Sequence, residues 1–235
     1  MNVRWLAVAA ILAAATAASA GSFSTDFEGY ALGPVAGQDG WVLDNAGAGA
    51  VDPVIASDPT GGGHGKVLQI DPNDFNVAGG WSGAFRSVGD LIAEGVNTFS
   101  VSWDQWRTGL GDNLWFAEDI SFGGWWGLQW DQDQNIHAIS NFGAPQAALT
   151  QQVWQGVRLD FDATAGTVTG YLDGVSFGAA TGQTFATFRG IDLEVEGSAA
   201  GGGLNGSNYI DNVVVTPEPA SVLLLAVAAA LLRRR

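Results

Sequence analysis

Short runs in which apolar and polar residues alternate, separated by glycine, restrict the possible folds of this chain more than any other feature. The 235 residues include 34 glycines, and no long amphipathic helix appears between Gly21 and Thr216. Because successive side chains of a β-strand point to opposite faces, alternation with a period of two predicts strands buried on one face. Ten such runs occur, at 22–27, 66–70, 96–103, 114–122, 125–130, 136–140, 153–162, 167–172, 191–196 and 209–215. We therefore expect an all-β protein in which two antiparallel sheets pack as a β-sandwich.

Residues 152–177 form the clearest local unit, a strand, a turn, a second strand, an Asp173-Gly174 turn and a short third strand. Asp-Gly favours a tight hairpin turn because both residues tolerate positive φ. The stretch VWQGVRLDFDATAGTVTGYLDGV resembles the Trp-led hairpin of concanavalin A-like lectin/glucanase sandwiches, including laminin-G-like domains. The segments FSTDFEGY and NYIDNVVV are similar to the first and last strands of such jelly rolls. The resemblance implies a jelly roll in which these two strands pair side by side.

The N-terminus has the three parts of a secretory signal peptide in their usual order. Arg4 precedes an apolar run that ends at Ala18, and Ala18-Ser19-Ala20 is a small-residue cleavage site. We expect residues 1–20 to form an apolar signal helix that signal peptidase removes after Ala20. The alternative is a buried N-terminal helix.

The C-terminus combines Pro217-Glu218-Pro219, 13 uncharged residues at 220–232, and Arg233, Arg234 and Arg235. A helix of that length spans roughly 20 Å, whereas a bilayer core is about 30 Å thick. The segment is therefore suited to transient membrane insertion, with the arginines on the cytoplasmic side. The two prolines favour an extended conformation, clear of the folded domain and of the helix.

This order of motif, apolar helix and basic end resembles the PEP-CTERM sorting tail. The resemblance implies that an exosortase in the inner membrane recognises residues 217–219, removes the helix and sends the protein to the cell surface or extracellular matrix. An ordinary tail anchor is the alternative. We thus divide the chain into a signal peptide (1–20), a β-sandwich domain (21–215) and a sorting tail (216–235).

The chain is strongly acidic, with 24 acidic and 9 basic side chains and a net charge of −15. Between residues 21 and 216 the only basic side chains are Lys66, Arg86, Arg107, Arg158 and Arg189. Such a charge argues against binding to nucleic acid and suits a cation such as calcium, although it can also serve solubility alone. Cysteine is absent, which excludes disulfides, thiolate metal sites and cysteine nucleophiles.

Tryptophans are the main candidates for binding sugar, because aromatic rings can stack on the apolar faces of pyranose rings. Seven of the ten lie between Trp81 and Trp130. Alternation assigns Trp103, Trp126 and Trp130 to the core, and Trp106, Trp115 and Trp125 to the opposite faces. We therefore expect polysaccharide to contact Trp106, Trp115 and Trp125, although large aromatic residues are most often buried.

Asp192, Glu194 and Glu196 alternate with Ile191, Leu193 and Val195, which places three carboxylates on one strand face, successively about 7 Å apart. They can accept hydrogen bonds from sugar hydroxyls, or a pair of them can act as acid and nucleophile. The pattern resembles the E-x-D-x-E strand of laminarinase-type glycosidases, but here it is D-x-E-x-E and lies near the domain's end. We expect a solvated acidic face and no catalytic residues.

Other polar residues give weaker indications. Glu28 and Asp211, on the terminal strands of similar jelly rolls, are the candidate ligands of a structural calcium. The 131–135 segment starts like a calcium loop but lacks its glycine and final glutamate. Glu118 shares the parity of apolar residues, so it points inward unless a bulge rotates it. His64 and His137 are too few for a zinc site, and we expect both to be bystanders.

Together these features predict an exported surface or matrix protein whose sandwich binds extracellular polysaccharide without catalysis and requires no cofactor beyond the candidate calcium. Two alternatives remain: a glycoside hydrolase or lyase of the same fold, and a structural matrix component with no ligand.

Overall fold

The computed structural model describes residues 22–45, 50–71, 81–108, 112–118, 125–130, 136–138, 147–196 and 206–218. Only the backbone is described for 112–118, 125–130, 136–138 and residue 196. These residues contain fifteen strands: β1 (Phe23–Thr25), β2 (Gly33–Pro34), β3 (Trp41–Leu43), β4 (Val54–Ser57), β5 (Lys66–Ile70), β6 (Trp81–Ser87), β7 (Thr98–Arg107), β8 (Asp112–Glu118), β9 (Trp125–Trp130), β10 (Ile136–Ala138), β11 (Gln155–Asp162), β12 (Thr167–Leu172), β13 (Val175–Ala180), β14 (Gly190–Glu196) and β15 (Asn208–Pro217).

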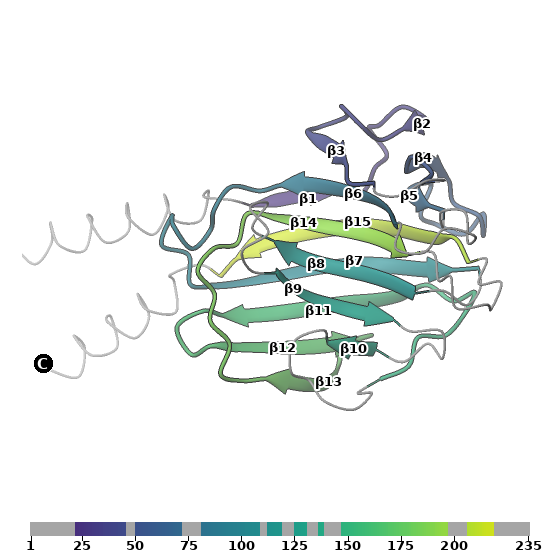
Figure 1. The fold of residues 1–235 in the computed structure, drawn as a ribbon. Helices are drawn as coiled ribbons and strands as arrows, with labels where there is room; N and C mark the ends of the chain where they lie inside the picture. The colour runs from purple at the N-terminus through teal and green to yellow at the C-terminus, as the bar shows by residue number, and fades with distance from the viewer. Residues whose placement is uncertain are drawn as a thin grey trace, which may run out of the picture.

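The strands form two antiparallel sheets that lie in two layers (Figure 1). The nine-stranded sheet has the order β13-β12-β11-β7-β15-β5-β4-β2, and β1 also pairs with β15. The six-stranded sheet has the order β10-β9-β8-β14-β6-β3. The predicted all-β sandwich is confirmed.

The core lies between the sheets and is built from alternate residues of facing strands. Its members include Phe99, Val101 and Trp103 of β7, Val157, Leu159 and Phe161 of β11, and Ile191, Leu193 and Val195 of β14. Phe99 stacks on Phe161 with ring centroids 4.8 Å apart, and Phe188 packs against both rings. Alternation therefore correctly predicted which side of these three strands faces inward.

Four strands, β2, β3, β4 and β6, were not predicted. The first three have only two to four residues, too few for alternation to be recognised. In β6 four consecutive residues, 82–85, are buried, so apolar and small residues occupy both of its faces. A strand covered on both faces does not alternate in polarity.

The first and last strands pair as the resemblance to jelly rolls implied, with Phe23 opposite Val215 and Thr25 opposite Val213. β15 continues beyond the predicted end of the domain, because Pro217 is buried opposite Phe99 and the N–H of Glu218 donates to the carbonyl of Thr98. The prediction that the Pro-Glu-Pro motif lies clear of the domain is therefore wrong for its first two residues. Proline lacks the N–H that a strand residue donates to its neighbour, and Pro217 is the residue at which β15 ends.

The described residues contain no helix that is long and apolar enough to cross a membrane. The predicted signal helix with Ala18 and Ala20, and the tail from Pro219 to Arg233, Arg234 and Arg235, lie outside the described residues. Export and processing of the tail stay predictions.

Candidate functional site

Two buried carboxylates lie on the outer face of the six-stranded sheet. In β14, which pairs with β6 and β8, Ile191, Leu193 and Val195 face the core, so the alternate residues Asp192 and Glu194 face outward. Yet Asp192 is only 1% exposed and Glu194 only 6% exposed. The prediction of a solvated acidic face is wrong for Asp192 and Glu194, because the outer face is covered at these two positions.

Asp44, which follows β3, completes a group that we call the acidic cluster. Oxygens of Asp44, Asp192 and Glu194 all lie within 4.8 Å of one another. Asp44 is held in place by its N–H, which donates to the carbonyl of Gly83 (2.9 Å). Asn45 supports the same segment, since its Oδ1 accepts from the N–H of Gly83 (2.9 Å).

Gly83 makes this approach possible because it lacks a side chain. A Cβ at this position would lie 2.6 Å from the carbonyl oxygen of Asp44 and 2.8 Å from Cγ of Glu194. Phe85, two residues further along β6, covers Gly190 on the same face, where a Cβ would lie 2.4 Å from its ring. The cluster therefore combines a glycine, an aromatic neighbour, two carboxylates from β14 and one carboxylate from the segment after β3.

The strand register extends this face onto β8 and β9. Leu114 is opposite Glu194 and Phe116 is opposite Asp192. Trp125 is opposite Glu118, which in turn is opposite Gly190. Residues directly opposite one another in a sheet share a face. Trp125 thus has a register position on the outer face, as predicted.

The register corrects the predicted faces of β8. Trp115 is opposite Leu193, so its register position is on the core face and the prediction of a surface position is wrong. Glu118 falls on the outer face, so no bulge is needed to keep it out of the core. Both faces of β8 carry large apolar residues, so the alternation of residue types in the sequence does not show which face is buried. Glu196 ends β14 opposite Trp81 and Asp112.

Three carboxylates at this spacing have a restricted set of chemical roles. Like charges that are close and poorly solvated disfavour one another's ionised form, and ligands that bring hydrogen-bond donors or positive charge relieve this cost. Carboxylate oxygens accept hydrogen bonds from hydroxyl groups, coordinate hard cations and transfer protons. The cluster is therefore suited to a polyhydroxylated ligand, a divalent cation or acid–base chemistry.

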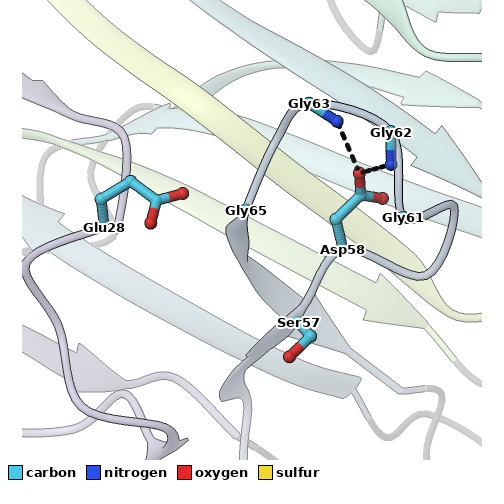
Figure 2. Close-up of a pocket in the computed structure, with 7 residues that line it drawn as sticks. All are labelled: Glu28, Ser57, Asp58, Gly61, Gly62, Gly63 and Gly65. Atoms are coloured by element: carbon cyan, nitrogen blue, oxygen red, sulfur yellow. Dashed lines mark hydrogen bonds between the residues drawn. The ribbon is translucent and has the colours of Figure 1, made fainter.

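A second polar region surrounds the loop at residues 58–65, which lines a cavity of about 450 Å³ together with Glu28 and Ser57. Figure 2 shows Asp58 inside this loop, where its Oδ2 accepts from the N–H groups of Gly62 (2.9 Å) and Gly63 (3.4 Å). Thr60 donates to Oδ1 through both its N–H and its hydroxyl group. Burial would raise the pKa of Asp58, but these hydrogen bonds prevail and lower it. Asp58 therefore organises the loop from within.

The loop and the first residue of β5 supply partners to the two candidate calcium ligands. Glu28 accepts from the N–H of Lys66 (2.8 Å), and Asp211 lies 2.8 Å from Nδ1 of His64. Burial raises the pKa of Asp211, while the hydrogen bond from His64 opposes the shift. His64 also stacks on Trp154 with centroids 3.9 Å apart, so it has a structural role where we expected a bystander. Calcium binding by Glu28 and Asp211 stays a prediction.

Trp106 is half-buried on the outer face of the nine-stranded sheet and meets Tyr209 edge to face (5.3 Å between centroids). Among the described residues its indole Nε1 has no hydrogen-bond acceptor. Trp106 is thus separated from the acidic cluster by the core, and the sequence candidates do not form a single site.

Comparison with solved structures identifies the fold. The chain is similar to a sialidase (14% identity, TM-score 0.64), with 83% of this chain aligned to 18% of that one. It is also similar to lectin II from Ulex europaeus (14% identity, TM-score 0.53), with 83% and 97% of the two chains aligned. A carbohydrate esterase of the Shiga toxin-encoding bacteriophage phi24B aligns over 80% of this chain and 97% of its own (11% identity, TM-score 0.52).

The chain has a concanavalin A-like, legume-lectin-like fold. This confirms the fold that the hairpin and terminal-strand resemblance implied. No protein-family model and no curated protein matches the sequence.

Proposed function

We propose that this lectin-like sandwich binds an uncharged polysaccharide, without catalysis, through the outer face of its six-stranded sheet. The observation that carries the proposal is the grouping of Asp192 and Glu194 with the half-buried Asp44, with oxygens of all three within 4.8 Å of one another. Carboxylate oxygens accept hydrogen bonds from the hydroxyl groups of a sugar, and the Asp44 side of the cluster is only half-buried.

The neighbourhood of the cluster supports a sugar ligand. Phe85 supplies a ring beside Asp192, and Gly83 lets Asp44 approach the strand closely enough to join the cluster. Sugar sites combine an apolar surface for the ring with a few oriented polar groups for the hydroxyls. A net charge of −15 disfavours acidic polymers, which narrows the ligand to neutral chains.

We also infer that the chain is exported by its signal segment and sorted by its PEP-CTERM tail, so that the sandwich meets polysaccharide at the cell surface or in the extracellular matrix. The inference rests on Ala18-Ser19-Ala20, Pro217-Glu218-Pro219 and the terminal arginines. Loss of surface localisation in an exosortase deletion strain, compared with the parent, tests it.

Affinity electrophoresis in gels containing neutral polysaccharides tests the binding proposal. Asp192→Asn and Glu194→Gln keep side-chain size and are expected to weaken retardation at least about tenfold, the effect of losing one charge-assisted hydrogen bond. Glu94→Gln is the matched control, because it removes an exposed carboxylate that lies outside the six-stranded sheet. Equal retardation of all three variants and the parent contradicts the proposal, and no retardation of the parent favours a purely structural matrix protein.

A glycoside hydrolase is the second candidate, since Asp192 and Glu194 have oxygens within 4.8 Å of each other. Retaining glycosidases place their two carboxyl groups about 5–5.5 Å apart. Release of reducing sugar from the same polysaccharides, abolished in Glu194→Gln, would establish this activity in place of simple binding.

A further inference from the structure

A groove of about 360 Å³ crosses the outer face of the nine-stranded sheet, on the opposite side of the core from the acidic cluster. Val101, Trp103 and Val157 point into the core that β14 also faces, so the alternate residues of β7 and β11 point away from β14. The lining residues that matter are Ser102, Asp104, Arg158, Tyr171, Asn212 and Val214.

One wall of the groove is formed by a β-bulge in β15. Asp211 is opposite Asp104 and Val214 is opposite Ser102, so two residues of β15 face one residue of β7. At the bulge Asn212 has a φ of 50°, a left-handed conformation that is uncommon for a residue with a side chain. Its amide Nδ2 donates to Oδ2 of Asp104 (2.8 Å). Bulges of this kind redirect side chains and are frequent next to functional sites.

The opposite wall is formed by Tyr171 and Arg158. The register between β12 and β13 shifts at Gly170 and Tyr171, so a second irregularity lies at this side. The guanidinium of Arg158 lies 4.2 Å from the ring centroid of Tyr171, a cation–π contact. Arg158 also pairs with Asp160 (3.0 Å). These contacts fix a planar donor group and an aromatic ring at one edge of the groove.

The floor between the walls is low. Gly156 is opposite Asp104, and Ser102 is opposite both Arg158 and Val214. The nearest atom to a Cβ placed on Gly156 is Oδ1 of Asp104, at 3.4 Å, so the space above this glycine is open. The small residues Gly156 of β11 and Ser102 of β7 thus lie between the two walls of the groove.

The polar groups in the groove complement a polyhydroxylated ring. Arg158 and Ser102 donate hydrogen bonds, and Asp104 and Asn212 accept them. Tyr171 and Val214 offer apolar surface beside them. Since the carboxylates of Asp104 and Asp160 outnumber the guanidinium of Arg158, the groove does not favour an anionic ligand.

We propose that this groove is a second saccharide-binding site. It does not depend on the acidic cluster, because the two sites have no residue in common and lie on opposite faces of the sandwich. A single chain that binds sugar at both faces can hold two polysaccharide strands together.

Isothermal titration of the intact chain with neutral hexasaccharides of glucose and of mannose tests the groove directly. Gly156→Leu fills the floor and is expected to weaken the groove's binding step at least tenfold, and Arg158→Ala should weaken the same step if Gly156→Leu fails to fold. Thr216→Leu is the matched control, because it adds the same side chain to an exposed position of β15 outside the groove. The parent and the control should bind two hexasaccharides, and Gly156→Leu one.

The doubly substituted Asp192→Asn, Glu194→Gln chain separates this inference from the proposed function. If the groove site exists and the cluster site does not, this double variant binds like the parent while Gly156→Leu loses binding. Unchanged stoichiometry and affinity in folded Gly156→Leu and Arg158→Ala, or a parent that binds no hexasaccharide, overturns the groove proposal.

Discussion

The outer faces of β14 and β11 differ sharply, although the two strands have the same pattern of apolar and charged residues. On β14, Asp192 and Glu194 are almost completely buried. On β11, the side chains of Arg158 and Asp160 are 50% and 35% exposed. The alternation identifies the core face of each strand correctly, but it does not reveal whether another segment covers the second face. Carboxylates on a covered strand face are unusual and indicate a candidate site, whereas charged residues on an open strand face are common.

The largest expected loss of stability comes from a substitution that forces Asp44 away from β6. Gly83→Ala should lower the free energy of unfolding by about 3 kcal/mol, because the new Cβ would meet the backbone oxygen of Asp44, which cannot move as a side chain does. Urea denaturation measures this change. Gly63→Ala is the control, since a Cβ there meets nothing within 4 Å. Equal stability of the two variants would show that Asp44 does not pack against β6.

The next largest effect concerns a covered part of the nine-stranded sheet's outer face, where the Asp58 loop places His64 on Asp211. Asp58→Ala should cost about 2 kcal/mol at pH 7, because the loop N–H groups lose their acceptor. Since the pKa of Asp58 is lowered in the folded state, its contribution is complete above the ordinary value of 3.8 and is lost as the pH falls below it. The parent and variant should therefore converge in acid, as followed by urea denaturation between pH 7 and pH 3. A difference that is constant with pH would contradict this role.

Addition of calcium tests whether a cation binds at Glu28 and Asp211 or at the acidic cluster. At ten times its dissociation constant, a calcium ion would stabilise the domain by about 1.4 kcal/mol, or about 3–6 °C in melting temperature. We expect Glu28→Gln to remove the shift and Asp192→Asn to retain it. The reverse result would assign calcium to the acidic cluster, and no shift between calcium and a chelator would show that the calcium prediction is wrong.

The smallest effect is expected on the open face. Arg158→Ala should change the free energy of unfolding by no more than about 0.5 kcal/mol, since its ion pair with Asp160 is exposed to solvent. Arg107→Ala is the comparison, because Arg107 is only 2% exposed and its removal should cost more than 1 kcal/mol. Thermal melting of both variants distinguishes a surface side chain from a buried one. A large loss for Arg158→Ala would mean that the groove residues stabilise the fold.

The sequence was most informative where one face of a strand is buried and the other is open. β5, β9 and β12 have the predicted bounds, and β11 has the predicted core face. In β8 the alternation was misleading, because Leu114 and Phe116 alternate with Trp115 and both faces carry large apolar residues. In such a strand only the pairing with β14 distinguishes inside from outside.

The candidate site could be predicted only in part. Alternation placed Asp192 and Glu194 together on one face, but Asp44 comes from a loop almost 150 positions earlier and has no local signal. Gly83 offered a clue, because a glycine among the aromatic residues of a strand often marks the close approach of another backbone. The groove depends on two register shifts, and the pairings that create them are long-range.

The pairing of β1 with β15 also has a mechanical consequence. Phe23 at the start of the described chain lies opposite Val215, near its end, so both ends leave the sandwich at neighbouring points (Figure 1). A force that pulls the two ends apart would act first on the Phe23–Val215 end of the β1–β15 pairing. It would break the hydrogen bonds between these two strands one after another. The pairing of β15 with β7 is loaded at the same end, because Pro217 lies opposite Phe99, but it is longer than the pairing with β1. A chain held at both ends would thus release β1 as a short extensible segment before the rest of the sandwich yields.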